Sequence, residues 1–283
     1  MRPPRSAAGA CAPARRHQRP GKAGAAVAAV WRLLLLVLVC GLSLQIYFAA
    51  RIALMALLAP QSTSFQRSEV WRQAVDKRQV VWAQQWVDAD LISVNLKRAV
   101  IASEDAGFIG HGGIEWDALE QAWEKNQRAE TAAARRQAQA QSRPRPTAAN
   151  GVAPQRTHVE AKLVGGSTIS QQLAKNLFLS GERTVLRKAQ EFVLTLMLEA
   201  LLSKDRILEI YLNNVEWGEG LFGAQTAARH YFRVDAARLD AYSAARLAVM
   251  LPAPKRYEKN PHSDYLAARA ASVAARMGAV ALP

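Results

Sequence analysis

The chain has 283 residues, half of them hydrophobic, and its 37 Lys and Arg against 23 Asp and Glu give a net charge of +14. This composition excludes an intrinsically disordered protein, and the length allows one domain with appendages or at most two domains. The excess charge favours an anionic partner such as nucleic acid, a lipid surface or a phosphate-bearing substrate. Its two cysteines, Cys11 and Cys40, leave no disulfide beyond residue 60 and lack a metal-binding spacing.

The positive charge is concentrated at the N-terminus. Residues 1–32 contain no acidic residue and supply seven of the fourteen excess positive charges. The remainder of the chain is therefore less basic than the total suggests, and we predict no nucleic-acid partner. We interpret residues 1–32 as a basic cytoplasmic tail.

An apolar segment follows the basic tail directly. Residues 33–50 carry no charge and would span about 27 Å as a helix, which is enough to cross a bilayer. A second apolar run, 52–59, follows Arg51, whose side chain could snorkel to lipid headgroups. We predict a transmembrane anchor over residues 33–59, and whether it ends with the first or the second run stays open.

Two alternatives to an uncleaved anchor are a buried helix and a cleaved signal peptide. The Arg-rich flank argues against a buried helix. The length of the apolar run, and Pro60 where a small-residue cleavage motif would be needed, argue against a signal peptide. The charge bias across the anchor predicts a cytoplasmic N-terminus, with the rest of the chain on the outer side of the membrane.

A helix that delivers two carboxylates is predicted after the juxtamembrane segment. Residues 60–92 form that segment, and the alternation over 79–87 is weakly strand-like. Ser93 is a suitable N-cap for the helix that follows. Glu104 and Asp105 would lie at its C-terminal end, where the helix dipole disfavours negative charge. An unfavourable placement of charge that brings no structural gain indicates a functional role for these carboxylates.

An amphipathic helix and an insertion are predicted next. Trp116, Leu119 and Trp123 recur at helical spacing, in a pattern that fades near residue 126. Residues 127–160 are rich in Ala, Arg and Gln, contain three prolines and no aromatic residue, and cannot bury enough surface to fold alone. We interpret 127–160 as a flexible inserted loop, with a partial helix in its first half as the alternative.

The segment from Gly165 to Asn176, GGSTISQQLAKN, carries small, hydroxyl, amide and ammonium groups with little core-forming bulk. Such a strip is typical of a surface that contacts a polar ligand. Guanidinium and ammonium groups precede Glu191 and suit a pyrophosphate. Together with Glu104, these features indicate chemistry on a phosphorylated sugar.

Three further helices are predicted toward the C-terminus, so that the fold class is mainly α. The first begins after Thr184, and its apolar spacing predicts a buried stripe that consists of Val193, Leu196, Met197, Ala200 and Leu201. Glu191 would lie opposite this stripe, with Arg187 one turn before it on the same face. Asp205 can cap the next helix, and the third, over 244–251, ends before a proline.

The pairing of Glu104 with Glu191 is a hypothesis, because the two residues are distant in sequence. Glycosyl transfer commonly needs one carboxylate as a base for the incoming hydroxyl, and a second acidic or cationic centre to manage leaving-group charge. The alternative is that both glutamates are solvated surface residues. Glu191 would then form a helix-surface ion pair with Arg187, worth roughly 0.3 to 0.5 kcal/mol.

Four motifs occur in the order of a known family. They are EDxxFxxHxG from Glu104, GGSTISQQLAKN from Gly165, RKxxE from Arg187 and ILEIYLN from Ile207. In this order they resemble the peptidoglycan glycosyltransferases, over about residues 93–260. The absence of SxxK and KTG signatures argues against an attached penicillin-binding transpeptidase domain. The resemblance is therefore to the monofunctional members of that family.

The resemblance implies a lysozyme-like, mostly helical glycosyltransferase domain over residues 93–283, which polymerises lipid II. Glu104 would be the base that deprotonates the 4-hydroxyl of the acceptor GlcNAc. That oxygen attacks the anomeric carbon of the growing strand, with inversion and release of undecaprenyl pyrophosphate. Glu191 matches the second family glutamate, which assists at the acceptor or the diphosphate side.

The resemblance also implies a set of substrate-binding positions. They are Asp105, Phe108, His111, Gly166, Ser167, Thr168, Gln171, Gln172, Lys175, Asn176, Arg183 and Arg187. Lys175, Arg183 and Arg187 match positions that hold the pyrophosphate. For Asp105 and its neighbours in the first motif a structural role stays equally open, and Glu209 and Asn213 are expected to shape the fold.

The implied partners are lipid II, the growing glycan strand, the membrane and proteins of cell-wall synthesis or division. The implied location is the inner (cytoplasmic) membrane, with a periplasmic catalytic domain. Family members are often aided by a divalent cation, Mg or Mn, but no ligand cluster in the sequence marks a metal site. Two rivals stay open: a lysozyme-like glycan-cleaving enzyme, which the cations before Glu191 oppose, and a noncatalytic membrane scaffold.

Overall fold

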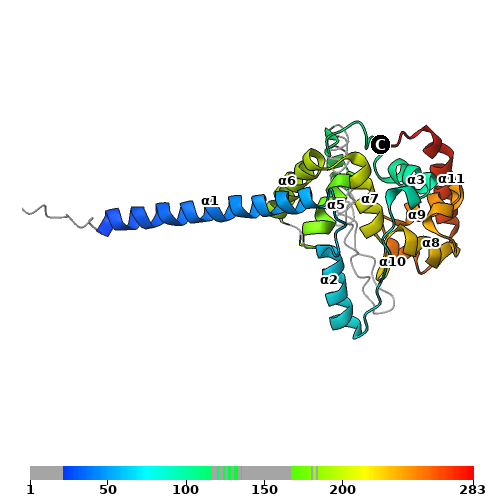
Figure 1. Cartoon of the computed structure of the whole chain (residues 1–283), viewed down its shortest axis with the longest axis horizontal. Helices are drawn as coiled ribbons and strands as arrows, with labels where there is room; N and C mark the ends of the chain where they lie inside the picture. Colours follow the sequence, from blue (N-terminus) through cyan, green and yellow to red (C-terminus); the bar gives the residue numbers. More distant parts are fainter. Residues whose placement is uncertain are drawn as a thin grey trace, which may run out of the picture. The chain divides into compact units, whose positions relative to one another are not determined.

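The computed structural model describes residues 22–116, 120, 124, 127, 128, 131, 132, 135, 167–179, 181, 182 and 184–283. The chain divides into two compact units, 1–48 and 49–283. The described part of the first unit is most of helix α1 (Lys22–Leu54), and the second unit holds the other elements (Figure 1).

Helix α1 has the length and composition of a membrane span. The stretch Ala29–Leu54 contains an 18-residue window with a mean hydropathy of 2.4, and none of this window is buried inside the protein. These properties are compatible with the predicted single-pass anchor. The helix begins at Lys22, inside the segment predicted as a basic tail, and its end at Leu54 falls between the two ends that the sequence left open.

The last turn of α1 belongs to the second unit and is fixed there. Ile52 is fully buried and Met55 is 5% exposed. The Arg206 guanidinium donates a hydrogen bond to the Met55 carbonyl at 2.7 Å. Arg51, which we expected to reach toward headgroups, lies over the ring of Phe178 at 5.7 Å. The end of the helix is therefore part of the folded unit.

Two helical segments, the second of which directly continues the first, and a small three-stranded sheet follow α1. Their bounds are α2 (Ser64–Arg72), η1 (Gln73–Lys77), β1 (Ala83–Gln84), β2 (Glu216–Gly218) and β3 (Leu221–Phe222). The strand order is β1-β3-β2, with β1 parallel and β2 antiparallel to β3. Of the strand-like stretch 79–87, only the two residues of β1 form a strand. Helix α2, which the sequence did not predict, begins with a capping box between Thr63 and Gln66.

The core of the second unit is built around helix α3. This helix (Val94–Glu104) packs against α9 (Ala241–Met250) and α11 (Asp264–Arg276), as Figure 1 shows. Ser93 caps α3 as predicted, because its hydroxyl accepts a hydrogen bond from the Asn95 N–H at 3.2 Å. The helix ends at Glu104 with Asp105 as C-cap, which confirms the predicted position of the two carboxylates.

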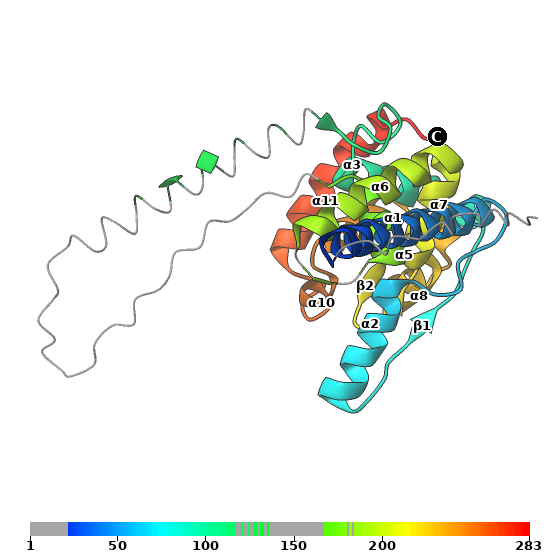
Figure 2. The same ribbon diagram turned by 90° about the vertical axis from the view of Figure 1, so that its left-hand side faces the viewer.

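A second group of helices lies beside this core. It consists of α5 (Ile169–Phe178), α6 (Val185–Leu201) and α7 (Lys204–Asn214), which contact one another and lie together in both views (Figures 1 and 2). Thr184 caps α6 as predicted. The cap of α7 is Ser203 rather than the predicted Asp205, which lies inside the first turn.

The predicted buried stripe of α6 is wrong. Val193 is 39% exposed, Leu196 53% and Leu201 42%, whereas Glu191, Leu194, Thr195 and Leu198 are buried. The helix thus packs through a mixed face that includes Glu191, and part of its apolar stripe points outward. The reason is that α5 presents polar groups toward α6, so the side chains facing it include charged ones.

The remaining described elements complete the second unit. They are η2 (Ala89–Leu91), α8 (Ala224–Phe232), η3 (Ala236–Arg238), α10 (Pro254–Tyr257) and η4 (Met277–Ala279). The helix predicted over 244–251 is α9, which begins three residues earlier. Trp116 is helical, but Leu119, Trp123 and nearly all of the insertion 127–160 lie outside the described residues.

Candidate active site

Helix α5 organises the candidate site. Thr168 and Gln171 form a capping box at its N-terminus, where the Thr168 hydroxyl accepts from the Gln171 N–H at 3.2 Å. Ile169, Leu173 and Leu177 are buried on one side of the helix. The polar residues on the other side therefore face the space between α5 and α6, as expected for a strip that contacts a polar ligand.

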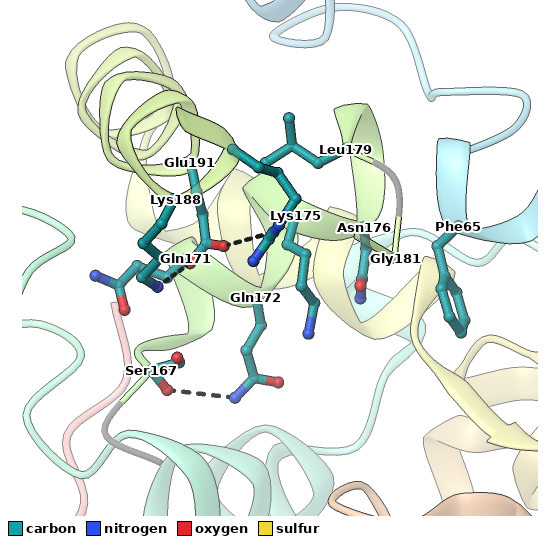
Figure 3. A pocket seen from close by; sticks show the side chains of 11 residues that line it. Phe65, Ser167, Gln171, Gln172, Lys175, Asn176, Leu179, Gly181, Lys188 and Glu191 are labelled. Carbon is teal, nitrogen blue, oxygen red and sulfur yellow. Dashed lines mark hydrogen bonds and ion pairs between the residues drawn. The ribbon is translucent and has the colours of Figure 1, made fainter. Parts of the chain in front are cut away.

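A cavity of about 370 Å³ opens beside α5. Figure 3 shows the side chains of α5 and α6 converging on it. The cavity is lined by Phe65, Ser167, Gln171, Gln172, Lys175, Asn176, Leu179, Gly181, Arg187, Lys188 and Glu191. Most of the predicted substrate-binding positions of the second and third motifs are thus brought together. Gly166 and Arg183 lie outside the described residues.

The cavity also contains residues that we did not predict. Lys188 was recognised only as part of a cationic run, although its charge and its place one residue after Arg187 were visible in the sequence. Phe65 comes from α2, more than a hundred residues before α5. No sequence signal links α2 to this cavity, because its position depends on packing between α2 and α5.

Glu104 is linked to the cavity through Gln172. Its Oε2 accepts a hydrogen bond from Gln172 Nε2 at 3.0 Å. Burial raises the pKa of Glu104, and the charge of Asp105 adds to this, while the Gln172 hydrogen bond and the charge of Lys175 act in the opposite direction. A carboxylate with a raised pKa is a stronger base than an exposed glutamate.

Asp105 joins the first motif to the start of α5. Its Oδ2 accepts from the Ile169 N–H at 2.9 Å, and its Oδ1 lies 2.8 Å from His111 Nε2. His111 Nδ1 accepts from the Gly113 N–H at 3.1 Å, so Nε2 carries the hydrogen that points to Asp105. Both side chains are therefore engaged in holding the loop, and a direct contact with substrate stays a prediction for each.

Other residues of the first two motifs are buried as well. Phe108 is fully buried and lies under the Lys204 ammonium, 4.5 Å from it. The Thr168 hydroxyl donates to the Gly113 carbonyl at 2.6 Å. Gly113 has a φ of +85°, and an added Cβ would lie 2.7 Å from the side chains of Glu199 and Thr195. Gly113 thus permits the close approach of this loop to α6.

Asp105, His111 and Glu115 are the only cluster of potential metal ligands found within the described residues. Their donor atoms lie within 4.8 Å of one another. However, both oxygens of Asp105 and both nitrogens of His111 already hydrogen-bond to the protein. Magnesium also prefers oxygen ligands to imidazole. In this arrangement the cluster does not fit the divalent cation that the family resemblance implied.

Glu191 lies between two cations of its own helix. Arg187 Nη1 is 3.1 Å from its Oε2, and the Lys188 ammonium contacts its Oε1. The i, i+4 pair with Arg187 confirms that both residues share one face. Glu191 is only 3% exposed, however, so this is not the solvated surface pair of the alternative interpretation. Glu191 fixes both cations at the cavity wall.

Lys175 contributes a further cation to the cavity. Within the described part of the chain it forms no ion pair, although it lines the cavity. The residue is exposed overall, yet desolvation at the cavity lowers the pKa of its ammonium, as do the charges of Arg187 and Lys188, while Glu191 and Glu104 oppose this. An anionic ligand between these groups would compensate the crowded positive charge.

Glu209 and Asn213 of the fourth motif shape the fold, as predicted. The fully buried Asn213 donates to the Val87 carbonyl and accepts from the Val87 N–H, both at 2.9 Å. Glu209 accepts from the Ala89 N–H at 3.2 Å and pairs with Arg206. These contacts hold the segment before α3 against α7.

Comparison with known proteins gives a consistent result. The pattern of the transglycosylase family matches residues 68–135 and 148–278. A protein of Paraburkholderia phytofirmans named biosynthetic peptidoglycan transglycosylase is 44% identical over 276 residues, which cover 95% of this chain and 98% of the relative. A protein of Burkholderia thailandensis with the same name is 47% identical over 243 residues, or 86% of this chain and 83% of the relative.

Proposed function

Because this chain belongs to the transglycosylase family, we propose that it is the peptidoglycan glycosyltransferase that polymerises lipid II into glycan strands. The observation that carries this proposal is the connection of a partly buried carboxylate to a cation-lined cavity. Glu104 is hydrogen-bonded to Gln172, which lines the same cavity as Lys175, a cation with no ion pair among the described residues. A base and a site for a pyrophosphate are the two parts that the reaction needs.

In the proposed reaction, Glu104 accepts the proton of the 4-hydroxyl of the acceptor GlcNAc. The acceptor oxygen forms a bond to the anomeric carbon of the growing strand, on the face opposite the leaving group. The bond from that carbon to the pyrophosphate oxygen breaks, and its electron pair leaves with undecaprenyl pyrophosphate. Attack from the opposite face inverts the anomeric configuration from α to β. The raised pKa of Glu104 supports its role as the base.

The cations of the cavity stabilise the negative charge that develops on the leaving pyrophosphate. Lys175 has no carboxylate partner in the described structure, and Arg187 Nε is buried without a hydrogen-bond partner there. Glu191 supports this role indirectly, because its carboxylate orients Arg187 and Lys188. We assign Glu191 to the diphosphate side of the site on this basis.

Membrane attachment fits a lipid-linked substrate. The apolar stretch Ala29–Leu54 is compatible with one membrane span. The basic residues before it favour a cytoplasmic N-terminus. We therefore propose an inner-membrane protein with a periplasmic catalytic unit, where lipid II, the glycan strand and other proteins of cell-wall synthesis would be its partners.

The main rival function is cleavage of glycan by a lysozyme-like enzyme. That reaction expels a neutral sugar hydroxyl, which does not need a cluster of cations. The cavity holds Lys175, for which the described structure shows no ion pair, and the two cations fixed by Glu191. These three cations therefore favour transfer from a pyrophosphate.

The proposal is tested with the detergent-solubilised full-length protein and labelled lipid II. Products are resolved by gel and digested with muramidase, for the wild type, for Glu104→Gln and for the control Asp76→Asn. Asp76 has a side chain that is 60% exposed, so its exchange matches the chemical change without touching the cavity. We expect a muramidase-sensitive polymer from the wild type and the control only. Cleavage of preformed glycan without polymerisation would instead establish the hydrolase.

A further inference from the structure

Tyr211 is a buried residue of the fourth motif that the reaction described above does not use. It belongs to α7 and is 1% exposed. Its hydroxyl donates a hydrogen bond to Gln172 Oε1 at 2.9 Å. The amide nitrogen of Gln172 in turn donates to Glu104 Oε2 at 3.0 Å. A continuous chain of hydrogen bonds thus leads from the core to the proposed base.

The groups around Gln172 fix the orientation of its amide. Two acceptors face its nitrogen, namely Glu104 Oε2 at 3.0 Å and the Ser167 carbonyl at 3.4 Å. The Tyr211 hydroxyl faces its oxygen and supplies the donor that this oxygen needs. The amide can satisfy all three contacts in only one of its two orientations, the one that directs N–H toward Glu104.

The surroundings of the Tyr211 hydroxyl favour its protonated form. Burial raises the pKa of Tyr211 well above its usual value, and the negative charges of Glu104 and Asp105 raise it further. It therefore remains a hydrogen-bond donor when Glu104 is ionised. Because Tyr211 is enclosed by the protein, it has no direct access to a ligand in the cavity.

We propose that Tyr211 is a positioning residue, which acts through Gln172 to hold the Glu104 carboxylate in place and to stabilise its ionised form. This role rests on the proposed function of Glu104 as the base. Without the Tyr211 hydroxyl, the oxygen of Gln172 loses its donor and the side chain loses its anchor in the core. The hydrogen bond that Gln172 gives to Glu104 then weakens, and the protonated form of Glu104 gains relative to the carboxylate.

The test is a double-mutant cycle with Tyr211→Phe and Gln172→Leu, in which kcat, KM and the pH dependence of kcat/KM are measured with labelled lipid II. Tyr211→Phe keeps the buried ring and removes only the hydroxyl. We expect kcat to fall about tenfold with little change in KM, and the acidic limb of the profile to move to higher pH. When Gln172 is already replaced by Leu, Tyr211→Phe should have no further effect on kcat or on the acidic limb of the pH profile.

Tyr231→Phe is the matched control, because the Tyr231 hydroxyl also donates a single hydrogen bond, at 2.8 Å, to the carbonyl of Trp217. This variant should leave the pH profile unchanged. The proposal is wrong if Tyr211→Phe lowers kcat by the same factor in the wild type and in Gln172→Leu, because the hydroxyl then does not act through Gln172. It is also wrong if Tyr211→Phe leaves the pH dependence of kcat/KM unchanged. Thermal unfolding of each variant separates these effects from a loss of folded protein.

A substrate-free measurement keeps this inference separate from the proposed function. The side-chain carboxyl of Glu104 is followed by NMR of ¹³C-labelled protein as the pH is varied, and Glu104→Gln identifies its signal. Tyr211→Phe should move the titration of Glu104 to higher pH even if no polymer is ever formed. Absence of polymer with the wild type would overturn the proposed function, whereas an unchanged titration would overturn the role of Tyr211.

Discussion

Gly113→Ala should destabilise the protein, whereas Gly112→Ala should not, although the two positions are adjacent. Gly113 has a φ of +85°, and a Cβ at this position would lie 2.7 Å from both Glu199 Cγ and Thr195 Cγ2. A Cβ added to Gly112 would have no neighbour within 4 Å. The pair therefore compares the same chemical change in a closed and an open environment.

The expected cost of Gly113→Ala has two parts. A non-glycine residue in the left-handed region costs about 1–2 kcal/mol, and overpacking against fixed neighbours costs about 1–3 kcal/mol. The sum, about 2–5 kcal/mol, is a large fraction of the roughly 5–15 kcal/mol by which domains are stable. At about 2–4 °C per kcal/mol for a domain of this size, the midpoint of thermal unfolding should fall by about 4–20 °C. Gly112→Ala should stay within about 0.5 kcal/mol.

Thermal unfolding of the full-length protein in detergent is monitored by circular dichroism. Polymerisation activity of each variant is then assayed below its unfolding midpoint. Activity of Gly113→Ala should fall as well, because Gly113 accepts from Thr168 and donates to His111. Equal midpoints for the two variants would refute the reasoning, since they would mean that the loop moves away from α6 at no cost.

Three other predictions test separate parts of the structure. Burial raises the pKa of Glu216 from 4.5 to about 7. The folded protein therefore binds a proton at Glu216 more tightly than the unfolded chain does, and the free energy of unfolding falls as the pH rises through that range. Glu216→Gln should remove a penalty of about 3 kcal/mol at pH 8 and change little at pH 4 in thermal unfolding. On α6, Leu198→Ala should cost about 2–5 kcal/mol in chemical denaturation, and Leu196→Ala should cost less than about 1 kcal/mol, because only Leu198 is fully buried. Lys175→Met should lower kcat/KM for lipid II about a hundredfold without lowering the unfolding midpoint, since the ammonium has no partner in the described structure.

Each of these three has an outcome that would contradict it. If Glu216→Gln stabilised the protein equally at pH 4 and pH 8, the stabilisation would not come from the titration of Glu216. If Leu196→Ala cost more stability than Leu198→Ala, the buried face of α6 would be the one that the sequence predicted. If Lys175→Met left kcat/KM unchanged, the cation would have no part in binding or leaving-group stabilisation.

The position of Glu104 could be predicted because its signals are local. Ser93 is a favourable cap, the apolar residues between it and Glu104 follow helical spacing, and glycines interrupt the pattern afterwards. Each of these features depends on residues a few positions apart, for which backbone geometry alone fixes the outcome. The capping box at the start of α5 is a local signal of the same kind, but we predicted only a polar strip there and no helix.

The buried face of α6 could not be predicted from its apolar spacing. A periodic stripe indicates which residues share a face, but not what that face contacts. Here the buried side is set by α5 and by the loop at Gly113, and it includes Glu191 and Thr195. Burial of Glu191 is acceptable because Arg187 and Lys188 neutralise it. Charged side chains are thus buried on α6 where apolar ones were expected. This happens beside the cavity, where the requirements of function and of packing differ.

Long-range partners were also invisible in the sequence. The fourth motif was recognised as a pattern, but the contact of Tyr211 with Gln172 joins residues 39 positions apart. Helix α2 has few apolar residues and is held by polar pairs, such as Glu69 with Lys255 at 2.6 Å. Such partners are set by the tertiary structure, since no periodicity within either segment specifies them.

The N-terminus of α5 is already occupied by groups of the protein itself. Helix N-termini are common phosphate sites because their free N–H groups point outward, but here Asp105 takes the Ile169 N–H and Thr168 takes that of Gln171. A pyrophosphate in the cavity would therefore be bound by side chains instead of a rigid backbone cradle, and Lys175 is the lining cation that no ion pair in the described structure fixes. Binding through ammonium and guanidinium groups weakens as ionic strength rises, and rotation of the Lys175 side chain would loosen it with no movement of the helix.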